Sequence, residues 1–160
     1  MEVHEQTLIY LRGLPASGKS TWASEYLSGN ANAIVVCRDN IREMLVTEYK
    51  NFPFGTKMES LVTDIELAAI DKALERGYTV IVDATNFRIT PNLIKHYNKT
   101  YRELGISVRL QDFCHVPLQE CIDRDAHRKD KGDKAVGEEV IRSMYNRYLK
   151  TADDDYWDSR

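Results

Sequence analysis

The chain of 160 residues has a net charge of −3 at pH 7, and 42% of its residues are hydrophobic. This length suffices for one domain with a sizeable core, and no apolar run approaches the roughly 20 residues of a membrane-spanning helix. The sequence pI of about 5.8 argues against a general nucleic-acid binder, although an enzyme could still grip a few phosphates locally. The polar N-terminus argues against a secretory signal, so we expect a cytoplasmic protein without a membrane partner.

Short β-rich runs alternate with helical stretches along the chain. The sequence predicts strands over residues 7–12, 32–37, 78–83 and 106–113. It predicts helices over residues 19–28, 57–76, 91–104 and 137–150, with two shorter ones after Asp39 and after Pro117. Asp39 is the expected N-cap of its helix, and Thr90 followed by Pro91 is typical of a helix start. The alternation predicts a parallel α/β sheet covered by helices on both faces, with its ligand beyond the carboxyl ends of the strands.

Residues 13–21, GLPASGKST, fit the pattern G-x-x-x-x-G-K-[ST] between a predicted strand and a predicted helix. Glycines let successive N–H groups point at one anion, and the helix N-terminus adds a partial positive charge, so this loop predicts binding of ATP phosphates. Lys19 is expected at the β- and γ-phosphates, and the Ser20 hydroxyl is expected to ligate Mg²⁺. The residues expected to line the nucleotide site are Gly13, Pro15, Ala16, Ser17, Gly18, Lys19, Ser20 and Thr21.

Carboxylates follow the second and third predicted strands. Asp39 and Arg42 lie three positions apart, which places them on one face of a helix. Phosphoryl transfer to an alcohol needs a carboxylate that accepts the hydroxyl proton and a cation that balances the transferring group. Spacing alone also allows a helix-capping aspartate beside a solvated arginine. Asp83 ends the third strand, where a Walker-B-type carboxylate would hold Mg²⁺ and where a residue that only caps the next turn is the alternative.

Four stretches in order resemble the kinase domain of bacteriophage polynucleotide 5′-hydroxyl kinases: GLPASGKST (13–21), RDNIR (38–42), DATN (83–86) and KAVGEEVIRSMYNRY (134–148). The resemblance implies an adenylate-kinase-like P-loop NTPase domain over residues 1–150, followed by an acidic tail over 151–160. It implies transfer of the γ-phosphate of ATP to 5′-OH ends of DNA or RNA, in the host cytoplasm if the protein is phage-encoded. The D-x-D-G-T signature of a 3′-phosphatase is absent from the chain, so kinase activity alone is expected.

The resemblance also implies roles for the residues around the acceptor. Asp39 matches the family's catalytic base, and Arg42 matches its phosphate-binding arginine, with Arg38 beside it. Other substrate contacts are expected from the third strand onward: Asp83, Thr85, Asn86 and Arg88. Some phage relatives carry the carboxylate immediately before the threonine, where this chain has Ala84, so the resemblance leaves open whether Asp83 serves substrate or metal.

A basic lid is expected over about residues 123–136, which are dense in mixed charge. Arg124 and Arg128 match an R-N-x-x-R-like sequence of the related kinases, which implies that Arg128 contacts the β- or γ-phosphates during catalysis and that Arg124 lies near the adenine. Lys131 and Lys134 are weaker candidates for the same task. A salt-bridged surface helix is the alternative interpretation of this charge pattern.

Two alternatives to a polynucleotide kinase also contain such a phosphate loop. A kinase of a small metabolite or nucleotide would share the loop and the fold. A non-catalytic nucleotide-binding module would tolerate the loss of Asp39, whereas a kinase would not. The sequence carries no signal for the oligomeric state or for a preference between DNA and RNA.

Overall fold

The computed structural model describes residues 5–150, so the predicted tail over 151–160 lies outside the described residues. The strands are β1 (Gln6–Arg12), β2 (Ala33–Cys37), β3 (Thr79–Asp83) and β4 (Ile106–Asp112). The α-helices are α1 (Lys19–Gly29), α2 (Arg38–Leu45), α3 (Lys57–Glu75), α4 (Pro91–Tyr101), α5 (Leu118–Asp130) and α6 (Glu138–Met144). Shorter turns are the 3₁₀ helices η1 (Tyr49–Asn51) and η2 (Arg102–Leu104) and the π-helical turn η3 (Tyr145–Leu149).

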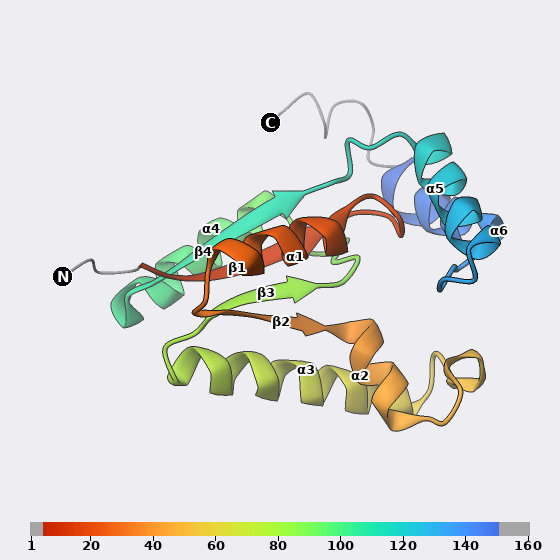
Figure 1. The fold of residues 1–160 in the computed structure, drawn as a ribbon. Helices are drawn as coiled ribbons and strands as arrows, with labels where there is room; N and C mark the ends of the chain where they lie inside the picture. The colour runs from red at the N-terminus through yellow and green to blue at the C-terminus, as the bar shows by residue number, and fades with distance from the viewer. Residues whose placement is uncertain (1–4, 151–160) are drawn as a thin grey trace.

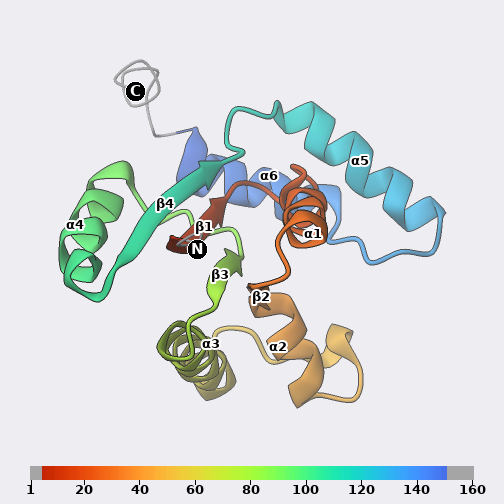
Figure 2. The same ribbon diagram turned by 60° about the vertical axis from the view of Figure 1, so that its left-hand side comes forward.

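The four strands form a parallel sheet in the order β2-β3-β1-β4 (Figure 1). Alternate residues of each strand point to opposite faces, and both faces carry apolar side chains. Leu8 and Val80 pack with Ile70 of α3 and Ile94 of α4, whereas Ile9 packs on the other face with Ala23 of α1. Figure 2 shows α3 and α4 on one side of the sheet and α1 on the other. The predicted α/β architecture with helices on both faces is therefore confirmed.

The last two α-helices pack on each other beside the phosphate loop. Cys121 and Ile122 of α5 and Ile141 of α6 are buried in one cluster with Leu14 of the loop. The charged segment expected from residue 123 onward thus begins as a direct continuation of α5, which runs to Asp130, whereas the apolar contacts of this helix with the loop lie in its first turns.

Local signals at helix starts were correct in one case and wrong in another. Thr90 caps α4 as predicted, since its hydroxyl oxygen accepts a hydrogen bond from the Leu93 N–H at 3.2 Å. Asp39 is not the N-cap of α2: Cys37 takes that position in an extended conformation, and β2 passes directly into the helix at Arg38. Asp39 lies instead in the first turn, where a carboxylate still interacts favourably with the helix dipole.

Among the described helices, none combines the length and the apolar character that crossing a membrane requires.

Candidate active site

The candidate site lies where β1, β2 and β3 end, the edge at which an open parallel sheet binds its ligands (Figure 2). The ends of the strands are tied together by hydrogen bonds. The Gly13 N–H donates to the Thr85 carbonyl at 3.1 Å, and the Phe113 N–H donates to the Arg12 carbonyl at 2.7 Å. The loop after β1 is therefore fixed to the loops after β3 and β4 before any ligand binds.

The phosphate loop needs glycine at its first position. Gly13 has φ +155°, and a Cβ there would meet Ser17 Oγ at 2.8 Å and Phe113 Cβ at 2.9 Å. Gly18, the residue before α1, has φ +104° and lies in the left-handed region that glycine reaches at little cost. These two positions let the loop curl tightly around the start of α1.

Lys19 is buried in this loop, with 8% of its surface exposed. Its ammonium donates to the carbonyl oxygens of Gly13 at 2.8 Å and Leu14 at 2.7 Å. Burial lowers the pKa of Lys19 to about 8, and the nearby carboxylate of Asp83 opposes that shift. The side chain is thus held inside the loop by two backbone acceptors and remains mainly charged at neutral pH.

Ser20 and Asp83 face each other across the first turn of α1. The Ser20 hydroxyl donates to Asp83 Oδ2 at 2.9 Å, and Asp83 is buried at the end of β3. Burial raises the pKa of Asp83, although the Ser20 hydrogen bond and Lys19 act against it. A buried carboxylate beside a hydroxyl fits a Mg²⁺ ion that takes most of its other ligands from phosphates and water. Within residues 5–150 there is no cluster of three or more His, Cys, Asp or Glu that would form an all-protein cage.

Asp39 lies beside this pair because Cys37 of β2 is in register with Asp83 of β3. Its side chain is 47% exposed, and Oδ1 accepts hydrogen bonds from Arg42 Nη1 and from the Tyr49 hydroxyl, both at 2.7 Å. Burial by itself raises the pKa of Asp39, but the hydrogen bonds from Tyr49 and Arg42 outweigh it and lower the pKa below its usual value. Asp39 is therefore an ionised carboxylate that is accessible at the edge of the site.

The two arginines next to Asp39 are paired with carboxylates of α3. Arg42 donates through Nε to Glu59 Oε2 at 3.2 Å and through Nη2 to Glu59 Oε1, and its guanidinium lies 5.2 Å from the centre of the Phe54 ring. Arg38 donates to Glu59 and pairs with Glu66 at 3.5 Å. Sequence reasoning missed both glutamates, although their spacing of seven places them on one face of α3. Two acidic side chains next to the apolar stripe of this amphipathic helix would have been the signal.

Residues 85–88, which follow β3, make backbone contacts to β1 and the phosphate loop or are exposed to solvent. Asn86, at φ +49°, donates through Nδ2 to the Leu11 carbonyl at 2.6 Å and to the Val82 carbonyl at 3.2 Å, so it braces β1 against β3. The Thr85 carbonyl is the acceptor for Gly13, and Arg88 is exposed to solvent. The substrate contacts expected from these three residues stay predictions.

The predicted basic lid, residues 123–136, begins beside the phosphate loop, which is the side of the site expected to hold the phosphate donor ATP (the donor side). Arg124 Nη1 lies 3.4 Å from the Ala16 carbonyl, and Arg128 follows one turn later in α5. Asp125, between them, is 3% exposed and accepts hydrogen bonds from the N–H groups of Val136 and Gly137, each at 2.9 Å. This carboxylate, which sequence analysis did not single out, folds the segment after α5 back toward α6.

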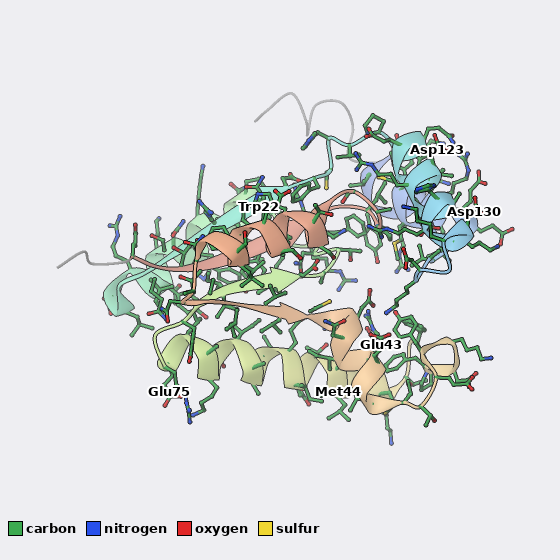
Figure 3. All side chains as sticks on the ribbon, viewed as in Figure 1. Trp22, Glu43, Met44, Glu75, Asp123 and Asp130 are labelled. Carbon is green, nitrogen blue, oxygen red and sulfur yellow. The ribbon has the colours of Figure 1, made fainter. Side chains whose placement is uncertain are left out.

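Lys134 reaches away from the phosphate loop, toward α2. Its ammonium lies 3.6 Å from the centre of the Tyr49 ring and 3.7 Å from Glu43 Oε1. Figure 3 shows Asp123 and Asp130 on α5 and Glu43 on α2; the segment with Lys134 leads from α5 to α6. The predicted lid thus joins the donor side of the site to the acceptor side.

The chain is similar to kinases of several kinds. A curated relative, the L-seryl-tRNA(Sec) kinase of Methanococcus maripaludis, is 30% identical over an alignment that covers 94% of this chain and 56% of that protein. The chain thus spans little more than half the length of this relative.

Solved structures extend the comparison. A chain in the structure of the Pnkp1/Rnl/Hen1 RNA repair complex superimposes with a TM-score of 0.71 at 24% identity, over 96% of this chain and 47% of that one. Another structure of the Pnkp1/Rnl/Hen1 complex gives a TM-score of 0.61 at 26% identity, over 78% of this chain and 40% of that one. A gluconokinase from Sinorhizobium meliloti 1021 shares the fold, with a TM-score of 0.50 at 17% identity over 90% of this chain and 75% of that one. Because residues 8–150 match the AAA_33 model, described as an AAA domain, the chain belongs to this family.

Proposed function

We propose that the protein is an ATP-dependent kinase that phosphorylates a hydroxyl group at the end of a nucleic acid, with the 5′-OH of DNA or RNA as the first candidate. The observation that carries this proposal is the position of Asp39. An ionised, half-exposed carboxylate follows the strand next to Asp83, and it lies near enough to Lys19 and Asp83 for its charge to act on both. A non-catalytic nucleotide-binding module would have no use for a base at this place.

The reaction follows from these groups. The acceptor hydroxyl gives its proton to Asp39 while its oxygen forms a bond to the γ-phosphorus of ATP. The bond between the γ-phosphorus and the β,γ-bridging oxygen breaks, and ADP leaves. Lys19 neutralises charge on the β- and γ-phosphoryl oxygens, and Arg128 adds a second cation from α5. Ser20 and Asp83 would hold Mg²⁺, which supplies further charge neutralisation when it is bound.

The charges near Asp39 limit how the acceptor is held. Arg38 and Arg42 are balanced by Glu59 and Glu66, so this side of the site does not present a row of unpaired cations for a long phosphodiester chain. An acceptor is therefore recognised by its terminal residue. Phe54, which is 56% exposed and has Arg42 over its ring, offers a surface on which a terminal base stacks.

A second candidate acceptor is a hydroxyl on an aminoacyl group carried by RNA. The curated relative at 30% identity is a kinase of seryl-tRNA, and the balanced charges around Arg42 suit a neutral acceptor group as well as they suit a nucleotide end. Both candidates share ATP as donor and Asp39 as base, and they differ only in which hydroxyl reaches it. The cytoplasmic location and the phage origin expected from the sequence stay predictions.

Incubation with γ-labelled ATP and a panel of acceptors separates these possibilities. The panel contains 5′-OH oligonucleotides of DNA and RNA, seryl-tRNA, nucleosides and gluconate. We expect label on the 5′-OH oligonucleotides; label on seryl-tRNA alone would select the second candidate, and label on a small molecule alone would contradict both. Asp39→Asn is expected to abolish transfer while ATP binding persists, and Asp71→Asn, at an exposed position of α3, is the matched control.

A further inference from the structure

We infer that Tyr49 is a positioning residue for the catalytic base: its hydroxyl helps to determine which oxygen of Asp39 faces the acceptor, and Lys134 holds the Tyr49 ring in place. This inference rests on the role proposed for Asp39. Nothing in the resemblance or in the similar proteins assigns a task to Tyr49, and for Lys134 the sequence predicts only a contact with the phosphates of ATP.

The geometry at Asp39 is asymmetric. The Tyr49 hydroxyl and Arg42 Nη1 both donate to Oδ1 at 2.7 Å, and Oδ2 receives neither of these bonds. Two donors on one oxygen stabilise the negative charge there and reduce its affinity for a proton. Proton transfer from an acceptor therefore goes to Oδ2, and the carboxylate is locked at one rotation.

Tyr49 is suited to remain a donor. Burial and the neighbouring Asp39 carboxylate raise the pKa of its hydroxyl, so the hydroxyl keeps its proton throughout the physiological range. The residue opens η1, a 3₁₀ turn that follows α2, and its ring meets Phe54 edge-on with a centroid distance of 6.1 Å. The hydroxyl thus approaches Asp39 from a segment ten residues further along the chain.

Lys134 contacts Tyr49 from a third segment. Its ammonium lies 3.6 Å from the centre of the Tyr49 ring, within the range of a cation–π interaction, and 3.7 Å from Glu43 of α2. The segment that carries Lys134 is tied to α5 through Asp125. The orientation of the base consequently depends on α2, on η1 and on the segment that also supports the donor-side arginines.

Tyr49→Phe tests this inference because it removes only the hydroxyl. The charged groups that act on Asp39 are Arg42, Lys134, Lys19 and Asp83, and none of them changes in this variant. Loss of a donor to the charged form raises the pKa of Asp39. We expect the acidic limb of the kcat/KM profile to move to higher pH, kcat to fall by about 10-fold, and KM for ATP to stay unchanged.

A direct titration keeps this test separate from the proposed function. The side-chain carboxyl carbon of Asp39, assigned with Asp39→Asn, is followed by NMR from pH 2 to 8 in the wild type, in Tyr49→Phe and in the control Tyr78→Phe. A higher Asp39 pKa in Tyr49→Phe alone supports the positioning role even if oligonucleotides are not the acceptor. An unchanged Asp39 pKa overturns the inference even if turnover falls, because Tyr49 would then act only on the stability of the loop.

Lys134 is tested with two variants. Lys134→Met removes the charge above the Tyr49 ring, and we expect a smaller shift of the Asp39 pKa in the same direction. Because the Lys134 charge also acts on Asp39 directly, the change is repeated in Tyr49→Phe, where a smaller effect than in the wild type is expected and an equal effect would show that Lys134 does not act through Tyr49. Lys134→Arg retains a cation that stacks on an aromatic face, and it is expected to restore the wild-type value. Equal behaviour of the two variants would remove Lys134 from the inference and leave Tyr49 to be judged by its own titration.

Discussion

The buried carboxylate of Asp125 offers a measurement of how firmly the segment after α5 is attached. Its two oxygens accept hydrogen bonds from the N–H groups of Val136 and Gly137, each at 2.9 Å, and only 3% of the residue is exposed. Asp125→Ala removes both acceptors and leaves the two N–H groups without them. A hydrogen bond to a charged group contributes about 1.5–3 kcal/mol, so the pair would contribute about 3–6 kcal/mol if the two were additive.

The expected loss is smaller than that sum. Val136 and Gly137 are half-exposed, so water reaches their N–H groups once the segment moves away from α5. We therefore expect a decrease in the free energy of unfolding of about 2–4 kcal/mol. For a chain of this size each kcal/mol lowers Tm by about 2–4 °C, which gives a total decrease of roughly 5–15 °C.

Thermal unfolding and urea unfolding, each followed by circular dichroism, measure this loss. Asp123→Ala is the matched control, because Asp123 lies two residues earlier in the same helix and is exposed. The control is expected to change stability by no more than about 0.5 kcal/mol. If Asp125→Ala proves as stable as Asp123→Ala, the two backbone hydrogen bonds do not hold the segment and the reasoning is refuted.

Three further predictions concern the strand ends and the phosphate loop. Gly13→Ala places a Cβ 2.9 Å from Phe113 Cβ at a φ of +155°. We therefore expect the free energy of unfolding to fall by about 1–3 kcal/mol and calorimetry to show weaker ATP binding. Wild-type ATP affinity in this variant would contradict the need for glycine. Burial alone would raise the pKa of Asp112, but the hydrogen bond from the buried Arg12, 2.6 Å away, outweighs it and lowers the pKa to about 2. This stabilisation is present above the unfolded pKa of about 4 and is lost as the pH falls toward 2, so Asp112→Asn should flatten the dependence of the urea midpoint on pH in that window. Chelation of Mg²⁺ should stop phosphoryl transfer. Ser20→Ala should raise the Mg²⁺ concentration needed for half-maximal transfer by about 10-fold or more. An unchanged Mg²⁺ concentration at half-maximal transfer would exclude the Ser20 hydroxyl as a ligand.

The features that the sequence determined by itself are local in the chain. Alternation of strands and helices follows from periods of two and 3.6 residues, and the structure confirms the parallel sheet that this alternation predicts. The phosphate loop is equally local, because its glycines and the start of α1 lie within nine residues of each other. Thr90 at the start of α4 belongs to the same class, since its hydroxyl bonds an N–H only three residues away.

The features that only the tertiary structure decided depend on how the elements pack. Asp39 looked like a helix cap by its position, yet β2 enters α2 without a turn, and the carboxylate binds Arg42 and Tyr49 instead. Arg42 looked like an unpaired cation, yet the packing of α2 on α3 brings Glu59 to it from 17 residues further along the chain. No spacing rule specifies such partners, because they are set by the relative placement of two helices. The residue types of the site could therefore be read from the sequence, whereas the charge balance and the orientation of its base arise from the folded structure.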